Sequence, residues 1–337
     1  MNISRENIKK SKKKTIARIL LFTLFFVGLL GAGFAYKLYL DVAKATDKMH
    51  SSISRTKSEK REEELEFKEK DPFSVLLVGV DEREGQNSRT DSILVLTVNP
   101  QMKSTKLVSI PRDTRATIVG MNKKDKINHA YAYGGIEGSI LTIENFLDIP
   151  IDYYIKVNME GFRDIVDAVG GIDVNNKFAF ELDGVYVPEG AVHLDGEQAL
   201  QYARMRKEDP NGDFGRQKRQ REVIQKILDK GASFSSLTKY DKVLKALEQN
   251  IKTNLTFKEM MDIQSHYKSA AFNVEQIEIP GEGKIMSDEL WYYNVEEKDR
   301  KALSNKLLDH LHLNKSVANQ QEINTAQKHT ITNEKQQ

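Results

Sequence analysis

Two short segments in the second half of the chain concentrate arginine side chains that could bind an anion together. Arg204 and Arg206 stand two residues apart, so in an extended chain both guanidinium groups would point to one side. The segment after Gly215 has an apolar stripe at helical spacing, which places Arg216 and Gln220 on the same inward-facing side. A charge at the buried end of such a stripe needs a partner, because an unpaired charge is costly to remove from water. We therefore expect an anion site beside a helix N-terminus, which itself favours negative charge.

A structural network of ion pairs is the alternative interpretation of these arginines. Glu208, Asp209 and Asp213 lie between the two segments and could neutralise each guanidinium group singly. For any one arginine this would be the more common arrangement. Three arginines supplied by two separate elements favour the anion site.

Two carboxylates and a further arginine are predicted to meet at one rim of a β-sheet. The Val and Leu content predicts three strands in an antiparallel meander, at Phe73–Val80, Ser92–Val98 and Lys106–Ile110. Asp81 then ends the first strand, Asp91 begins the second and Arg112 follows the third. In a meander these three points lie on the same rim.

Carboxylates at such a rim could hold Mg²⁺, which takes its remaining ligands from water and from substrate phosphates. A divalent cation beside several arginines is what a pyrophosphate group requires, since its transfer depends on positioning and on neutralising the developing charge. The alternative is that Asp81 is a turn residue and Asp91 a loop cap. The sequence thus predicts a magnesium-dependent pyrophosphate site.

The first 70 residues have the composition of a membrane anchor followed by a spacer. Ile19–Tyr36 contains 18 residues without a charge, enough for a membrane helix, and follows a cluster of lysines that predicts a cytoplasmic N-terminus. A cleaved signal peptide is the alternative. We expect a cytoplasmic segment at 1–18, a transmembrane signal anchor at 19–36 and a charged stalk at 37–70.

The remaining sequence predicts one mixed α/β domain at 71–313 and a disordered, Asn- and Gln-rich tail at 314–337. The expected fold is a central, mostly antiparallel sheet flanked by helices. Further helices are predicted at Ile136–Leu147, Phe162–Val169, Tyr240–Asn250 and Phe257–Tyr267. Further strands are predicted at Tyr153–Val157 and Val274–Ile279. Asp195 and Gln198 form the pattern of a capping box, which predicts a short helix before the arginines.

Composition excludes several classes of function. The chain has no cysteine, which excludes thiol catalysis and cysteine-ligated zinc. Residues 1–40 carry a net charge of +7 and the rest of the chain −5, so the predicted domain lacks the basic surplus of a general nucleic-acid-binding protein. We expect no nucleic-acid partner.

The motifs of the chain, taken in order, closely resemble those of the LytR-CpsA-Psr family, whose members include wall teichoic acid ligases of Gram-positive bacteria. The resemblance covers roughly Phe73 to Gly231 and rests on the segments VGVDER (78–83), SRTDS (88–92), SIPRD (109–113), KIN (126–128), AYAYGG (130–135), VGGI (169–172), GEQAL (196–200), RMR (204–206) and DFGRQ (213–217). The predicted anchor and charged stalk also fit that family's layout.

The resemblance implies a membrane-anchored phosphotransferase with an extracellular catalytic domain at 71–313 and its motif core at 73–231. Such enzymes move an anionic glycopolymer, typically wall teichoic acid or capsule, from a polyprenyl pyrophosphate carrier to the C6 hydroxyl of N-acetylmuramic acid in peptidoglycan. By this resemblance Asp81 and Asp91 bind Mg²⁺, Asp91 and Arg112 are catalytic, and the pyrophosphate is bound by Arg83, Arg112, Arg204, Arg206, Arg216 and Gln220. The family's polyprenyl tail lies in an apolar tunnel between sheet and helices.

Two other functions use the same features. A non-catalytic protein that binds polyprenyl phosphates or wall glycans would need the same arginines. A transcriptional regulator, a label historically attached to parts of this family, would need a cytosolic DNA-contacting domain, and the sequence has no helix-turn-helix pattern. We expect a single-pass type II protein of the cell membrane that acts on peptidoglycan.

Overall fold

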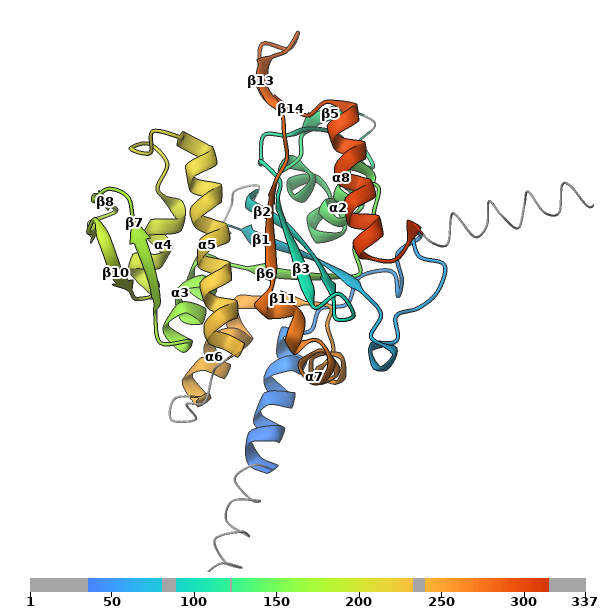
Figure 1. The fold of residues 1–337 in the computed structure, drawn as a ribbon, viewed down its shortest axis with the longest axis vertical. Coiled ribbons are helices and arrows are strands. Elements are labelled where there is room, and N and C mark those ends of the chain that lie inside the picture. The colour runs from blue at the N-terminus through green and yellow to red at the C-terminus, as the bar shows by residue number, and fades with distance from the viewer. Residues whose placement is uncertain (1–35, 81–88, 122, 233–239, 315–337) are drawn as a thin grey trace, which may run out of the picture.

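The computed structural model describes residues 36–80, 89–121, 123–232 and 240–314. Its centre is a six-stranded sheet in the order β11-β6-β1-β2-β3-β12 (Figure 1). These strands are β1 (Phe73–Val80), β2 (Thr90–Asn99), β3 (Ser104–Ser109), β6 (Tyr153–Val157), β11 (Ile251–Thr253) and β12 (Val274–Glu278). The predicted meander of β1, β2 and β3 is confirmed. Strands β6 and β12 pair in parallel with β1 and β3, so the sheet is mixed.

One face of the sheet is covered by two helices, α2 (His129–Leu147) and α8 (Glu297–His310), which lie together in Figure 1. Alternate residues of each strand point to this face, among them Leu76, Val78 and Val95, and all three are fully buried. Burial of this face against both helices forms the largest core cluster, because apolar surface is removed from water on both sides.

A second core lies beside the sheet and carries the arginine segments. It contains α3 (Met159–Ala168), β7 (Ile172–Asn176), β8 (Phe180–Leu182), β9 (Val185–Val187), β10 (Gly190–Leu194), α4 (Gly196–Arg204) and α5 (Gly212–Ala232). Helix α4 opens with the predicted capping box, in which Gln198 N–H donates to Asp195 Oδ1 over 2.9 Å. On α5, Val223 is fully buried in this core, which confirms that the predicted apolar stripe faces inward.

The remaining elements complete the edges of the domain. Helices α6 (Tyr240–Asn250) and α7 (Phe257–His266) lie near β11, and a short 3₁₀ helix, η2 (Lys268–Phe272), precedes β12. Two antiparallel hairpins lie at the end of the molecule opposite the first described residues (Figure 1). They are β4 (Arg115–Ile118) with β5 (Lys123–Lys126), and β13 (Glu282–Ile285) with β14 (Trp291–Asn294).

The segment predicted to be a solvated stalk packs on the domain, and this expectation needs correction. Residues 36–49 are helical, and the Tyr39 ring lies edge-on to Phe257 of α7 at 5.1 Å. Further along, Arg61 forms a buried ion pair with Asp152, and Phe67 belongs to a core cluster. The charges of this segment therefore indicate specific partners on the domain rather than solvation, and the folded unit begins well before residue 71.

The predicted anchor at 19–36 lies outside the described residues except for Tyr36, as does the predicted tail except for Asn314. Within the described part of the chain, none of the helices combines the length and the apolar character needed to cross a bilayer.

His310 closes the C-terminal helix onto the sheet and gives the fold a pH dependence. Its ring nitrogens lie 2.8 Å from Thr97 Oγ1 and 2.9 Å from Ser104 Oγ, and burial lowers its pKa to about 4. In the unfolded chain His310 has its ordinary pKa of 6.5 and binds a proton more tightly than in the folded protein. The stability that the buried neutral ring contributes is therefore complete above pH 6.5 and is lost as the pH falls toward 4. We expect a loss of about 3 kcal/mol over this window.

Urea unfolding between pH 4 and 7 measures this effect. His310→Gln should flatten the pH dependence, whereas the partly exposed His266 in the last turn of α7 offers a matched control, His266→Gln, that should keep the native slope. Equal slopes in native protein and His310→Gln would contradict the prediction.

Candidate functional site

The rim of the sheet predicted to carry the chemistry is formed by the end of β1, the start of β2 and the residues after β3. Gly79 and Ser92 are register partners at this rim, and Arg112 follows the end of β3 by three residues. Helix α5 joins the rim from the second core, because Ser92 Oγ donates a hydrogen bond to Gln220 Oε1 over 3.1 Å. Gln220 Nε2 donates in turn to the carbonyl of Ala203, near the end of α4. The two sets of predicted residues therefore converge on one place.

Asp91 and Arg112 are directly bonded across this rim. Arg112 Nη1 lies 2.6 Å from Asp91 Oδ1, and its Nε lies 3.7 Å from Asp113 Oδ2. Asp113 Oδ1 is also 2.7 Å from Lys126 Nζ of β5. Both Asp91 and Arg112 are partly open to solvent, so a ligand could reach either side chain.

Arg216 is the buried cation of the cluster. Only 7% of the residue is exposed, and its Nη2 lies 2.6 Å from Asp213 Oδ1 in the first turn of α5. Its Nε makes no hydrogen bond to any residue that the structure describes. Burial lowers the pKa of Arg216, Asp213 opposes this shift, and the positive charges of Arg112 and Arg206 lower the pKa further. An arginine nevertheless stays protonated, so the buried charge of Arg216 depends, among the described residues, on Asp213 and Asp91 for compensation.

The sequence predicted that the Arg204 and Arg206 side chains would point to the same side, but the structure separates them. The chain stays helical through Arg204, so the two residues do not alternate along an extended segment. Arg204 Nη1 lies 2.7 Å from Asp183 Oδ2, in the turn between β8 and β9, whereas Arg206 is exposed and its charge acts on Arg216. The structure thus brings Arg112, Arg206, Arg216, Gln220 and Asp91 together and holds Arg204 on a separate carboxylate.

The charges of the cluster do not balance. The cations are Arg112, Lys126, Arg206 and Arg216, and the carboxylates that pair with them are Asp91, Asp113 and Asp213. The alternative of internal ion pairs is therefore partly realised, because Asp213 holds Arg216. One positive charge remains in excess among the described residues, and this excess favours an anionic ligand.

Arg219 is a structural residue of this site that the sequence reasoning missed. It is buried, forms an ion pair with the buried Asp209, and donates Nε–H to the carbonyl of Tyr202 over 2.7 Å. A second guanidinium nitrogen donates to the carbonyl of Met205, so Arg219 fixes the loop that carries Arg206. Its spacing of three from Arg216 and four from Val223 places it on the inward face of α5, and this signal was available in the sequence.

Gly215 is required by the same arrangement. A β-carbon at this position would lie 1.8 Å from a carboxylate oxygen of Asp209. The close approach of Asp209 to the α5 backbone therefore explains the glycine of the segment DFGRQ.

The predicted metal pair can be tested only in part, because Asp81 and Arg83 lie outside the described residues. Asp91 Oδ1 accepts the bond from Arg112, and Oδ2 has no partner among the described residues. One or two carboxylates completed by water and phosphate oxygens suit Mg²⁺, so the donor chemistry of Asp91 fits. Within the described residues, no group of three or more acidic or histidine side chains forms a closed metal site.

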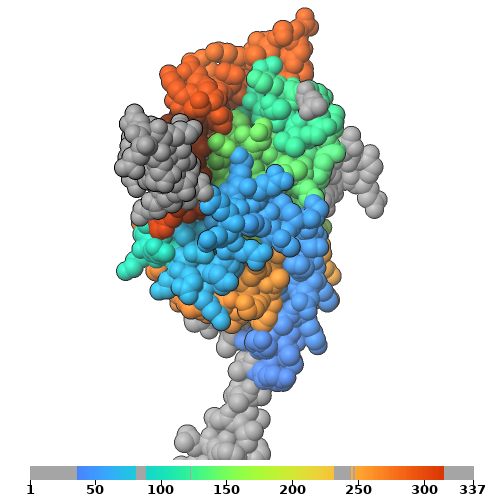
Figure 2. Space-filling view, turned by 90° about the vertical axis from the view of Figure 1, so that its right-hand side faces the viewer, coloured from blue at the N-terminus to red at the C-terminus, as the bar shows by residue number. Residues whose placement is uncertain are grey.

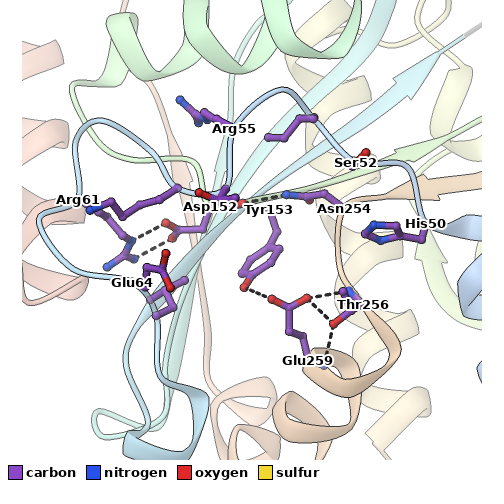
Figure 3. Close-up of a pocket in the computed structure, with 14 residues that line it drawn as sticks. His50, Ser52, Arg55, Arg61, Glu64, Asp152, Tyr153, Asn254, Thr256 and Glu259 are labelled. Carbon is purple, nitrogen blue, oxygen red and sulfur yellow. Dashed lines mark hydrogen bonds and ion pairs between the residues drawn. The ribbon is translucent and has the colours of Figure 1, made fainter.

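A polar cavity of about 380 Å³ lies elsewhere, between the N-terminal segment and the base of β6 and α7 (Figure 3). Its groups bond to one another, since Tyr153 O–H donates to Glu259 Oε1 over 2.8 Å and Arg61 pairs with Asp152. It contains none of the predicted site residues. We therefore place the candidate active site at the rim and not in this cavity.

Comparison with known proteins agrees with the motifs. A Bacillus cereus protein named polyisoprenyl-teichoic acid--peptidoglycan teichoic acid transferase TagU is 50% identical over 301 residues, which cover 88% of this chain and 99% of that protein. A solved structure described as TagT bound to LIIa-WTA is 33% identical, with a TM-score of 0.66 over 78% of this chain and 100% of that chain. A structure from Enterococcus faecalis, described as a transcriptional regulator, is 43% identical, with a TM-score of 0.68 over 74% of this chain and 90% of that one.

The family model described as LytR_cpsA_psr family matches residues 36–309. This range includes the N-terminal segment that packs on the domain, and it ends within α8. The resemblance noted in the sequence is thus confirmed, and the chain belongs to the LytR-CpsA-Psr family.

Proposed function

We propose that this protein is a teichoic acid transferase of the cell surface. It moves an anionic glycopolymer from a polyprenyl pyrophosphate carrier to the C6 hydroxyl of N-acetylmuramic acid in peptidoglycan. The relative named for this activity is 50% identical along 88% of the chain, and a relative of similar fold has been solved with a wall teichoic acid ligand. The proposal includes a type II membrane anchor at 19–36 and an extracellular domain.

The observation that carries the proposal is the buried Arg216, paired with Asp213, beside the further cations Arg112 and Arg206. A pyrophosphate supplies several acceptor oxygens and the missing negative charge at one point. Its binding would release Arg112 and Arg216 from their present carboxylates. Arg204 would also bind the pyrophosphate, by leaving Asp183 for a phosphate oxygen. This exchange is possible because the side chains of Arg204 and Asp183 are both partly open to solvent.

The sheet face toward α5 offers a surface for the polyprenyl chain. Leu77, Leu96, Ile155 and Val157 point to this face from the inner strands β1, β2 and β6, and all four are only partly buried. Their register neighbours Val75, Leu94 and Leu107 on the same face are buried, so the apolar surface is open at these four positions rather than along the whole face. It begins directly below Gly79 and Ser92 at the rim, so a lipid tail bound there would lie next to the proposed pyrophosphate site.

The transfer would proceed by attack of the acceptor hydroxyl on the phosphorus that carries the glycopolymer. The new bond joins the C6 oxygen to phosphorus, the bridging P–O bond of the pyrophosphate breaks, and polyprenyl phosphate leaves. Asp91 takes the hydroxyl proton, while Arg112 and Arg216 hold the phosphate oxygens and stabilise the developing charge. Mg²⁺ held by Asp81 and Asp91 would, when bound, neutralise further charge on the pyrophosphate.

The metal requirement gives the first functional prediction. Removing divalent cations with EDTA should lower transfer of a polyprenyl-pyrophosphate glycan about 100-fold, and added Mg²⁺ should restore it. Asp81→Asn should raise the Mg²⁺ concentration needed for half-maximal transfer, because it removes a ligand charge and leaves the proposed base Asp91 in place. Full transfer in EDTA would contradict the metal part of the proposal.

A regulator of transcription would need the domain in the cytosol. The chain after residue 40 carries a net charge of −5, so this part of the protein has no surplus of positive charge with which to bind DNA phosphates. A C-terminal tag on cells that is cleaved by externally added protease would support the extracellular placement. A tag that is protected in intact cells and cleaved only after lysis would contradict it.

A further inference from the structure

One face of the β13–β14 hairpin carries an apolar strip that leads to the candidate site. Ile285 and Trp291 are register partners, as are Gly283 and Tyr293, so all four lie on the same face. Ile285 and Trp291 are 73% and 45% exposed, whereas Tyr293 is buried. The other face carries Lys284 and the buried Tyr292. Exposed tryptophan and isoleucine on a projecting hairpin are unusual for a protein surface without a partner.

The positions of the two aromatic rings in the strip depend on glycines, which leave room for the rings of Trp291 and Tyr293. A β-carbon at Gly283 would lie 2.7 Å from the Trp291 ring, and one at Gly281 would lie 2.7 Å from the Tyr293 ring. Each ring therefore lies close to the glycine backbone of the neighbouring strand. The turn is also ordered by hydrogen bonds, since Asp288 accepts from Leu290 N–H and from Tyr292 O–H. The indole is thus held in place with nearly half of the residue open to solvent.

The buried Tyr293 connects the strip to the arginine cluster. The Tyr293 ring lies edge-on to Phe214 at 5.6 Å, and Phe214, itself 47% exposed, is two residues from Arg216. Tyr293 N–H also donates to the carbonyl of Asp113, next to Arg112. An extended molecule on Trp291 and Phe214 would therefore end at the candidate site.

The position of the hairpin argues against a membrane as its partner. Figures 1 and 2 show it projecting from the end opposite the N-terminal helix at 36–49. Its turn also carries Asp288 and Glu289, which a lipid interior would disfavour. The hairpin thus points away from the bilayer that the proposed anchor would occupy.

We propose that this strip, in which the exposed Phe214, Trp291 and Ile285 surround the buried Tyr293, binds a glycan chain of N-acetylated hexosamines, the acceptor of the transfer. The apolar C–H faces of such sugars fit exposed aromatic rings, and their hydroxyl and amide groups stay in water or meet the polar rim. This assignment rests on the proposed function for the identity of the acceptor. It adds an acceptor subsite to a site otherwise described only for the pyrophosphate.

The chain provides its own reporter, because Trp291 is its only tryptophan. Titrating the full-length protein with soluble, uncrosslinked peptidoglycan glycan strands should shift the tryptophan emission to shorter wavelength and saturate. Dextran, which lacks N-acetyl groups, should give no saturable change. Gly283→Ala keeps the tryptophan but displaces its ring, and should weaken the glycan affinity at least fivefold.

Retention on insoluble peptidoglycan tests the side chain itself. Trp291→Ala should lower the retained fraction at least fivefold, whereas Phe272→Ala should not. Phe272 is a matched control because it is 61% exposed and lies in η2, at the opposite rim of the sheet.

Three results would overturn the assignment: no emission change with glycan strands, an equal response to dextran, or native retention of Trp291→Ala. An emission shift that follows protein concentration without glycan would also overturn it, because a second copy would then be the occupant. The assay separates this inference from the proposed function. If glycan strands shift the emission but the protein has no transfer activity, the glycan site is supported and the proposed function is not. If transfer depends on Arg112 but glycan strands do not shift the emission, the glycan site is contradicted and the proposed function stands.

Discussion

Arg112→Ala is expected to lower the rate of glycopolymer transfer about 1000-fold while leaving the domain folded. Arg112 is partly open to solvent and lies 2.6 Å from Asp91, so it can contact both the phosphate and the proposed base. Loss of one arginine that stabilises the charge of a phosphoryl transition state costs about this much. The measurement is the rate at which a polyprenyl-pyrophosphate glycan is joined to peptidoglycan, followed by mass spectrometry with circular dichroism as the folding check.

Arg300→Ala is the matched control for this experiment. Arg300 lies on α8 and bonds to Glu297 and to the carbonyl of Phe146, on the sheet face away from α5. Its variant should transfer at the native rate. Transfer by Arg112→Ala within threefold of the native rate would remove the central support for the proposed function.

Asp152→Asn is expected to lower the free energy of unfolding by about 3 to 5 kcal/mol. Asp152 and Arg61 are both buried, and Asp152 also accepts hydrogen bonds from the backbone and hydroxyl of Ser74. The amide removes the negative charge and places an N–H donor beside a buried guanidinium group, which leaves Arg61 without compensation. Thermal unfolding should show a decrease in Tm on the order of 10 °C.

The adjacent residue supplies the comparison for this prediction. Lys60 pairs with Asp148, but the two side chains are 34% and 63% exposed, so this pair lies at the surface. Lys60→Ala should therefore change stability by less than about 0.5 kcal/mol. Equal effects of the two substitutions would show that the N-terminal segment is not held by its buried pair.

Much of the fold could be predicted from the sequence because its central strands are strongly patterned. The β1, β2 and β3 meander was predicted within two residues at each end, and β6 and α6 match their predicted bounds. Helix α2 begins at His129 rather than at Ile136, because a kink at Gly134 and Gly135 interrupts its helical period. Local periodicity describes only the part after the kink.

The N-terminal segment could not be predicted in this way. Its Lys, Arg and Glu content is typical of a solvated spacer, and only the fold reveals the buried acids that its arginines meet. Glu144 is such an acid, since it accepts hydrogen bonds from Arg55 and Ser58 although it lies 86 or more residues away in sequence. Long-range pairing of this kind leaves no local signal.

The candidate site was predicted more fully than the contacts inside it. The rim position of Asp91 and Arg112 followed from strand order, and Arg216 and Gln220 followed from helical spacing. Arg204 differs because α4 continues through Arg204 instead of ending before it, and helix ends are the least predictable part of a sequence. Roles that depend on Asp81 and Arg83 stay predictions, because those residues are outside the described part.

The attachment of the N-terminal segment fixes how far the enzyme can reach. Residues 50–70 are bonded to the domain, and the helix at 36–49 contacts α7 through Tyr39. The length of this helix is therefore the most that the described residues could place between the domain and the proposed anchor. At 1.5 Å per residue this helix measures about 20 Å. The domain would therefore work within a few nanometres of the lipid headgroups, so the lipid carrier would have to leave the bilayer by only a short distance. Nascent glycan nearest the membrane would then be modified before older layers of the wall.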